Sequence, residues 1–357
     1  MVSGKEILKA LSLVMDPDLG RDIVSLGFIK DLAVSESSVS FSIELTTPAC
    51  PMKQRIRDEA ERAVSAVKGV EKVEIKMTAR VRSAPQGPDK AMVPGVRNIV
   101  AVASGKGGVG KSTVSVNLAI ALAARGARVG LMDADIYGPS IPLIMGISSE
   151  PGVEGEKVIP VEKFGVKVIS MAFFMKGDEA VVWRGPMLHR AVSQFLGGVD
   201  WGELDYLIVD LPPGTGDIAL SLCTLVPVTG AVVVSTPQDM ALNVAQKAIA
   251  MFGVLKCGIV GIVENMSHYI CPGCGRREDI FGTGGARAAA EKRGIPFLGE
   301  IPLSTALRRA CDEGLPEVSV LAESDWGKAF SAIAGNVASR ISVINSSERA
   351  PASAGGK

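Results

Sequence analysis

The feature that most constrains the fold of this chain is a glycine-rich loop, SGKGGVGKST, at residues 104–113. It follows an almost wholly apolar run, NIVAVAS, and precedes an apolar helical stretch, STVSVNLAIALAARG. Within it, GKGGVGKS fits the pattern G-x-x-x-x-G-K-[ST], in which backbone N–H groups and a helix N-terminus surround phosphate oxygens. A strand, such a loop and a helix in this order predict an α/β domain that binds a nucleotide.

The loop pattern predicts a role for each of its residues. Lys111 is expected to reach the β- and γ-phosphates, and the hydroxyl of Ser112 is expected to bind Mg²⁺. The predicted phosphate-binding residues are Gly105, Lys106, Gly107, Gly108, Val109, Gly110, Lys111, Ser112 and Thr113. Lys106 stands on the other side of the glycines from Lys111 and has no evident role in its own loop, so a solvated surface lysine is the alternative.

Two further apolar runs end in acids. Asp210 closes the run in DYLIVDLPPGTGD, and Asp133 and Asp135 follow RVGLM. Ligands of parallel sheets bind at the carboxyl ends of the strands, so Asp210 is expected to hold Mg²⁺ through a water molecule. We expect Asp135 to orient the attacking water, whereas Asp133 either supports the metal indirectly or only caps the next segment.

The pattern of apolar residues divides the chain into parts. Residues 1–82 read as helix, strand, helix and strand, which predicts a small α/β domain, and SAPQGPDKAMVPG indicates a linker over 83–96. Over 97–342, short continuous apolar strands alternate with helices, which predicts a mainly parallel sheet covered by helices. Residues 343–357 are small and polar and predict a disordered tail.

Composition excludes several classes of protein. Lys+Arg and Asp+Glu balance at 38 each, so no overall charge favours nucleic acid or an anionic membrane. No run approaches the 18 apolar residues of a membrane span. The balanced charge and the lack of such a run predict no nucleic-acid or membrane partners. The six cysteines are poor material for a disulfide framework, which predicts a reducing, cytoplasmic location.

One cysteine pair stands out, in YICPGCGRRE. Cys271 and Cys274 lie on a tight Pro-Gly turn that suits one metal centre, but a tetrahedral zinc ion or a [4Fe–4S] cluster needs four ligands. Two chains could supply two thiolates each across a two-fold axis. From the residues alone, half of a zinc site and a redox dithiol remain open. His268 is a spare ligand candidate or a surface residue.

Several stretches resemble known proteins. SGKGGVGKST, with its extra lysine, resembles the deviant phosphate-binding loop of the ATPase group that includes the MinD, ParA, ArsA and nitrogenase iron proteins. DADIYGPSIP, WRGPM, DYLIVDLPPGTGD, STPQ, VENMS and CPGCG resemble the Mrp/ApbC family of iron–sulfur cluster carrier ATPases. DPDLGRDIVSLGFIKDL and ELTTPACP make the N-terminal part similar to the MIP-eighteen-like domain.

The resemblance implies an ATPase that works as a homodimer. Lys106 would act on the nucleotide of the partner subunit, with Lys111 and Asp135 as the other catalytic residues. Asn265 would read the adenine, and an ordinary asparagine turn is the alternative for it. Cys271 and Cys274 would hold a [4Fe–4S] cluster for transfer to apo iron–sulfur proteins. The alternative function is a MinD- or ParA-like positioning switch, which the non-basic, non-amphipathic tail disfavours.

Other residues carry weaker expectations. Cys50 precedes a predicted helix, which would lower the pKa of its thiol and let it receive or pass on a cluster; an inert, half-buried cysteine is the alternative. Cys223, Cys257 and Cys311 are expected in the core. Met171, Trp183, Arg184 and Met187 form either a client surface or core packing.

Overall fold

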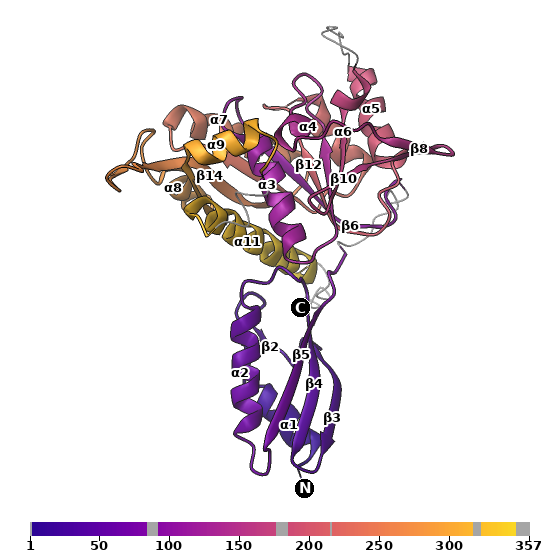
Figure 1. The fold of residues 1–357 in the computed structure, drawn as a ribbon, viewed down its shortest axis with the longest axis vertical. Coiled ribbons are helices and arrows are strands. Elements are labelled where there is room, and N and C mark those ends of the chain that lie inside the picture. Colours follow the sequence, from indigo (N-terminus) through magenta and orange to yellow (C-terminus); the bar gives the residue numbers. More distant parts are fainter. Residues whose placement is uncertain (1, 84–91, 176–184, 215, 317–322, 348–357) are drawn as a thin grey trace, which may run out of the picture. The chain divides into compact units, whose positions relative to one another are not determined.

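We describe the protein from a computed structural model, in which residues 2–83, 92–175, 185–214, 216–316 and 323–347 are described. The chain forms two compact units (Figure 1). The first unit is made of Met1–Arg82 and Ala338–Lys357, and the second is Ser83–Val337.

The first unit is a small sheet covered by helices. Its strands β3 (Ile29–Ser35) and β4 (Ser38–Leu45) are antiparallel, β4 is parallel to β5 (Lys72–Ala79), and β1 (Met15–Asp16) pairs separately with β2 (Arg21–Asp22). Helices α1 (Gly4–Leu11) and α2 (Lys53–Ser65) each bury one apolar side. These sides pack with β4 into one core, because α1, α2 and β4 all contribute fully buried side chains to it. The sequence prediction of two strands missed β3, whose side chains are partly or fully exposed and give no run of buried residues.

The second unit is built on a nine-stranded sheet of order β10-β11-β7-β12-β6-β13-β14-β15, with β16 also on β14. All its pairs are parallel except β10 with β11 and β14 with β15. The central strands are fully buried, as their continuous apolar sequences require when helices cover both faces. The strands are β6 (Val96–Ser104), β7 (Val129–Asp133), β10 (Val161–Lys163), β11 (Val166–Ser170), β12 (Leu204–Asp210), β13 (Gly230–Ser235), β14 (Ile259–Ile270), β15 (Arg277–Glu278) and β16 (Phe297–Leu303), beside a separate hairpin of β8 (Gly152–Glu154) and β9 (Lys157–Ile159).

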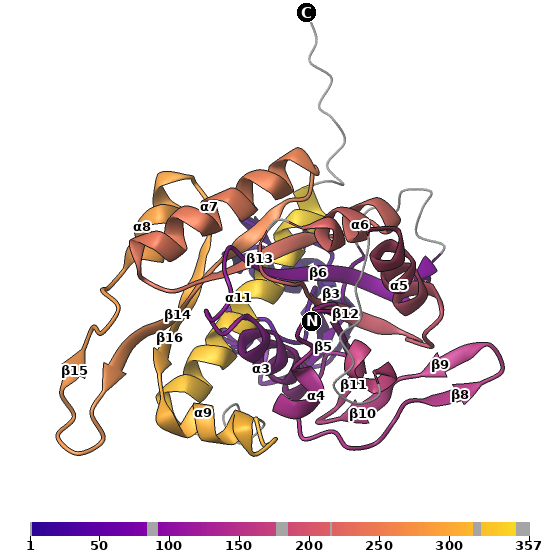
Figure 2. The same ribbon diagram turned by 90° about the horizontal axis from the view of Figure 1, so that it is seen from above.

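Helices cover both faces of this sheet (Figure 2). They are α3 (Lys111–Ala124), α4 (Ile141–Ile144), α5 (Gly185–Gly197), α6 (Asp217–Leu225), α7 (Asp239–Val254), α8 (Gly285–Lys292), α9 (Thr305–Asp312), α11 (Asp325–Ser347) and the short turn η2 (Met171–Phe174). The group α5 to α8 lies on one face, and α3, α9 and the first part of α11 lie on the other (Figure 2). Helix α3 is buried along most of its length, because it packs under the centre of the sheet.

Two predicted boundaries change. The expected tail from 343 was wrong at its start, because α11 continues to Ser347 and the Asn345 side chain donates a hydrogen bond of 2.9 Å to the carbonyl of Arg82. The expected linker ends earlier, since Val93 and Val96 are buried in the core of the second unit. Trp183 and Arg184 lie outside the described residues. Met171 is buried in the core, whereas Met187 is 45% exposed.

Candidate nucleotide and thiol sites

The glycine-rich loop joins the C-terminal end of β6 to the N-terminus of α3. Gly108 and Gly110 both have φ of +79°, a left-handed conformation that side chains disfavour. A Cβ atom on Gly105 would lie 2.3 Å from the backbone of Val244, so α7 also passes too close for a side chain. The loop therefore presents its backbone without side chains in the way, as a phosphate site needs.

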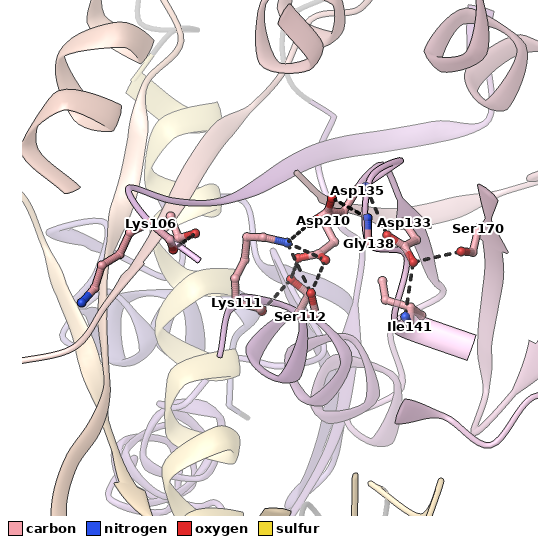
Figure 3. Close-up of polar contacts among 11 residues, drawn as sticks. Lys106, Lys111, Ser112, Asp133, Asp135, Gly138, Ile141, Ser170 and Asp210 are labelled. Atoms are coloured by element: carbon pink, nitrogen blue, oxygen red, sulfur yellow. Dashed lines mark hydrogen bonds and ion pairs between the residues drawn. The ribbon is translucent and has the colours of Figure 1, made fainter. Parts of the chain in front are cut away.

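A buried charged cluster lies directly beside the loop (Figure 3). The Nζ of Lys111 is 2.7 Å from Oδ2 of Asp210, and the two side chains are 6% and 0% exposed. The hydroxyl groups of Ser112 and Ser115 donate to the two oxygens of the same carboxylate, at 2.7 and 2.6 Å. The fold thus brings together the predicted phosphate lysine and the two predicted Mg²⁺ ligands, whose roles remain predictions.

Ser115 was missed by the sequence analysis. Its signal was its position three residues after Ser112 on α3, which places both hydroxyls on one side of the helix. The motif names only Ser112, so nothing in it distinguishes Ser115 from other helical serines.

The two acids after β7 have different environments (Figure 3). Asp133 is fully buried and accepts hydrogen bonds from the Ser170 hydroxyl and from the backbone N–H groups of Ile141 and Asp135. Burial, and the nearby Asp210 carboxylate, raise the pKa of Asp133 to about 7. Asp133 therefore anchors the loop between β7 and α4 rather than facing an open site.

Asp135 instead faces the cluster. Its Oδ2 lies 3.9 Å from the Nζ of Lys111, its side chain is 14% exposed, and Oδ1 accepts a hydrogen bond from the N–H of Gly138. Burial raises the pKa of Asp135, and the Lys111 ammonium opposes that rise. It also lines a cavity of about 520 Å³ with Pro212 and Pro213, so it can contact a water molecule there.

Lys106 points away from the cluster around Lys111 (Figure 3). Its Nζ donates a hydrogen bond of 3.2 Å to the side-chain oxygen of Gln238, just before α7. Lys106 therefore makes no contact with the carboxylates that Lys111 contacts. Its expected role on the nucleotide of a partner subunit remains a prediction.

Asn265 supports the loop from β14. Its Nδ2 donates a hydrogen bond of 2.8 Å to the carbonyl of Val109, and the residue is 5% exposed. Next to it lies a mainly apolar cavity of about 520 Å³, lined also by Gly110, Thr113 and residues after β16. The amide thus holds the loop with one N–H, and its expected contact with adenine remains a prediction. The segment from Pro302 to Asp312, which lines this cavity, was not identified from the sequence.

The cysteine pair lies at the tip of the β14–β15 hairpin. The N–H of Cys271 donates to the carbonyl of Arg276 at 2.9 Å, which closes the turn. Cys274 is exposed and Cys271 is half-buried. Backbone N–H groups of Gly273 and Cys274 lower the pKa of the Cys271 thiol, so its thiolate is favoured. Among the described residues, no three His, Cys, Asp or Glu side chains are placed to hold a metal ion together.

The expected low pKa of Cys50 was wrong. Burial, with a smaller contribution from the carboxylates of Asp16 and Asp18, raises the pKa of its thiol to about 11. Backbone N–H groups near the start of α2 lower it, but they do not offset the loss of water. Cys50 therefore resembles the inert cysteine that was the alternative prediction.

The remaining cysteines are buried or half-buried, as expected. Cys257 is buried in the core of the second unit, and the half-buried Cys223 packs against that core. Cys311 is buried on α9 and lines the cavity beside Asn265. The ring of His268 contacts the Ser267 hydroxyl at 2.9 Å, and it belongs to no cluster of potential ligands among the residues described.

A phosphate-type loop between a buried parallel strand and a helix, with a lysine, two serines and an aspartate in contact beside it, defines a P-loop NTPase. The comparisons with known proteins agree. Residues 95–338 match the ParA group described as the NUBPL iron-transfer P-loop NTPase, and residues 5–77 match the iron-sulfur cluster assembly protein family. The chain belongs to the family of iron-transfer P-loop NTPases.

Individual relatives support the same assignment. An iron-sulfur cluster carrier protein of Synechocystis is 46% identical over 96% of this chain and 99% of its own. The nucleotide-binding protein of Archaeoglobus fulgidus, solved in complex with ADP, is 42% identical, with a TM-score of 0.59 over 68% of this chain and 95% of its own. The cell division ATPase MinD of Pyrococcus furiosus is 26% identical, with a TM-score of 0.51 over 67% of this chain and 98% of its own.

These findings confirm the predicted family, the P-loop α/β fold class and the prediction of a nucleotide-hydrolysing enzyme. They also confirm the iron–sulfur carrier function at the level of the family. Among the described residues, no helix combines the length and the apolar character that crossing a membrane requires.

Proposed function

We propose that this chain is an ATP-hydrolysing carrier that holds a [4Fe–4S] cluster between two subunits and transfers it to apo iron–sulfur proteins. The observation that carries the proposal is the hairpin with two accessible thiols in the same unit as the P-loop cluster. The carrier named from Synechocystis supports the iron–sulfur cargo, and the ADP complex from Archaeoglobus supports the nucleotide.

The nucleotide half uses the residues beside the loop. Lys111 would bind the β- and γ-phosphates, which requires it to exchange Asp210 for the nucleotide. Ser112 and Asp210 would hold Mg²⁺, whose charge stabilises the charge that develops on the phosphates. Asp135 would orient the attacking water, because it is the carboxylate that faces both Lys111 and the cavity.

The cargo half uses Cys271 and Cys274. A [4Fe–4S] cluster takes four thiolates, and this hairpin offers two without a third neighbour among the residues that the structure describes. A second copy of the hairpin would complete the set across a two-fold axis. The lowered pKa of Cys271 favours the thiolate that binds iron.

The same dimer gives Lys106 a function. A lysine that is bound to Gln238 and directed away from its own phosphate site would reach the nucleotide of the partner subunit, where it would stabilise transition-state charge. Because all six cysteines are free thiols, we place the carrier in the reducing cytoplasm.

The test is anaerobic reconstitution with iron and sulfide. We expect about four iron and four sulfide per dimer, with iron–sulfur absorption and Mössbauer spectra. Cys271→Ser and Cys274→Ser should each lose the cluster but keep ATP binding, whereas the control Cys50→Ser should keep both. Full cluster content in the double variant, or zinc that iron cannot displace, would contradict the proposal.

A further inference from the structure

The cysteine hairpin also forms one wall of the cavity beside the loop. Tyr269 on β14 and Ile280 just after β15 both line this cavity of about 520 Å³. The other walls come from the start of α3, with Gly110 and Thr113, and from α9, with Leu307. The cavity is of ordinary size for a small-molecule pocket and touches Gly110 of the loop, so the nucleoside end of a nucleotide fits its position and its apolar lining.

The hairpin ties this wall to the thiols. Tyr269 pairs with Glu278 across the hairpin and with Leu303 on β16, and Cys271 follows two residues later. The N–H of Cys271 donates a hydrogen bond to the backbone carbonyl of Arg276 across the turn. A shift of Tyr269 therefore moves the backbone that positions Cys271.

The inner part of β14 is held separately. Asn265 is bonded to the loop carbonyl of Val109, but the pairing of β14 with β16 is irregular between Asn265 and Tyr269. Met266, within this interval, has φ of +56°, which an unbranched non-glycine residue rarely adopts. The outer hairpin is thus joined to the inner strand through an interval without a regular ladder, where the hydroxyl of Ser267 donates a hydrogen bond of 3.1 Å to the carbonyl of Ile301; a small rotation of the hairpin would take place at this interval.

An occupied cavity would restrict that rotation. Ile280 is 54% exposed, and an apolar ring system in the cavity would remove part of this surface from water only while the hairpin stays against it. The polyphosphate end of a nucleotide would lie at the loop and would make no such contact.

We propose that Tyr269 and Ile280 are positioning residues through which the nucleoside part of a bound nucleotide fixes the hairpin and protects Cys271 and Cys274. Its significance for cargo rests on the proposed function, but the coupling itself concerns thiols and nucleoside alone. Linkage between equilibrium affinities is reciprocal, so a ligand that binds the thiols reversibly and that bound nucleotide weakens would weaken nucleotide binding by the same factor.

The experiment uses the full chain without metal. The alkylation rates of Cys271 and Cys274 by iodoacetamide are followed by peptide mass spectrometry with no ligand, with saturating Mg·ADP, and with saturating Mg·tripolyphosphate. We expect ADP to slow alkylation about fivefold or more, and tripolyphosphate to leave the rate nearly unchanged.

Variants test whether the protection of the thiols depends on Tyr269 and Ile280. Tyr269→Ala and Ile280→Ala, each at saturating ADP, should abolish the protection. Leu143→Ala is the control: Leu143 lines the same cavity but lies on α4 and not on the hairpin, so this variant should keep the protection. Ile280 is exposed, so its variant separates the contact from a folding defect. Equal protection by tripolyphosphate, no protection by ADP, or full protection in Ile280→Ala would overturn the inference.

The cargo is measured separately in the same preparations. Protection by ADP in a protein that never binds a cluster would refute the proposed cargo and leave the coupling intact. Cluster binding without protection would do the reverse.

Discussion

The nucleotide loop and the cysteine hairpin lie in one unit of the molecule, but they are built in opposite ways. Lys111 and Asp210 are almost fully buried, and each finds its counter-charge within this chain. The hairpin thiols are accessible, and they have no further ligand beside them among the described residues. The difference shows that a buried charge needs a counter-charge within the same fold. An exposed pair of thiols does not, so its remaining metal ligands can come from another molecule.

The largest expected effect separates the two lysines of the loop. Lys106→Ala should lower kcat about 10³-fold, as loss of a charge supplied in trans does, while ATP affinity falls less than about fivefold. Lys111→Ala should lower ATP affinity by about 10- to 100-fold, because it removes a charge-assisted hydrogen bond to phosphate. Steady-state ATPase assays and nucleotide titrations give both numbers; equal losses of affinity would contradict a role of Lys106 in trans.

A second test compares thiols. At pH 8, only a fraction of about 10⁻³ of a thiol with a pKa of about 11 is present as thiolate. Cys50 should therefore react with iodoacetamide at least about 100-fold more slowly than Cys271. The rate of Cys50 alkylation should keep rising up to about pH 11. The rate of Cys271 alkylation should level off below pH 9.0, because the pKa of its thiol is lowered from the ordinary value of 9.0. Mass spectrometry across pH measures both, and comparable rates at pH 8 would show that Cys50 is not buried as described.

A third test substitutes one side chain of the buried cluster and one of the hairpin, and compares the stability of the two variants. Asp210→Asn removes the nearer of the two carboxylates beside the buried Lys111 ammonium and leaves only Asp135 at 3.9 Å, so it should lower the free energy of unfolding by about 3 kcal/mol. Cys274→Ser, at an exposed position, should change it by less than about 0.5 kcal/mol. Chemical denaturation without nucleotide measures both, and equal effects would remove the distinction between a locally balanced and an open site.

The smallest expected effect concerns the bond between β14 and the loop. Asn265→Ala should cost about 1–2 kcal/mol of stability, since it leaves a buried carbonyl without its donor, and should weaken ATP binding. Asn336→Ala removes a similar bond, 2.8 Å to the carbonyl of Leu298. It should cost a similar amount of stability without any effect on ATP; weakened binding in both variants would mean that Asn265 has no special connection to the loop.

Local patterns in the sequence predicted a large part of this protein. The glycine-rich loop between an apolar strand and a helix, the acids that end two apolar runs, and CPGC are each contained in a few consecutive residues. Such segments are recognisable because backbone conformation, strand burial and ligand spacing depend on near neighbours. The same segments carried the family resemblance that the comparisons confirm.

Only the tertiary structure decided how these segments meet. Ser115 and Asp210 are 95 positions apart, Lys106 and Gln238 are 132 apart, and Asn265 and Val109 are 156 apart. Burial is likewise a property of the fold, which is why Cys50 has a raised pKa where its position before a helix predicted a lowered one. The contacts of a side chain, and the water it loses, are set by segments that no local pattern identifies.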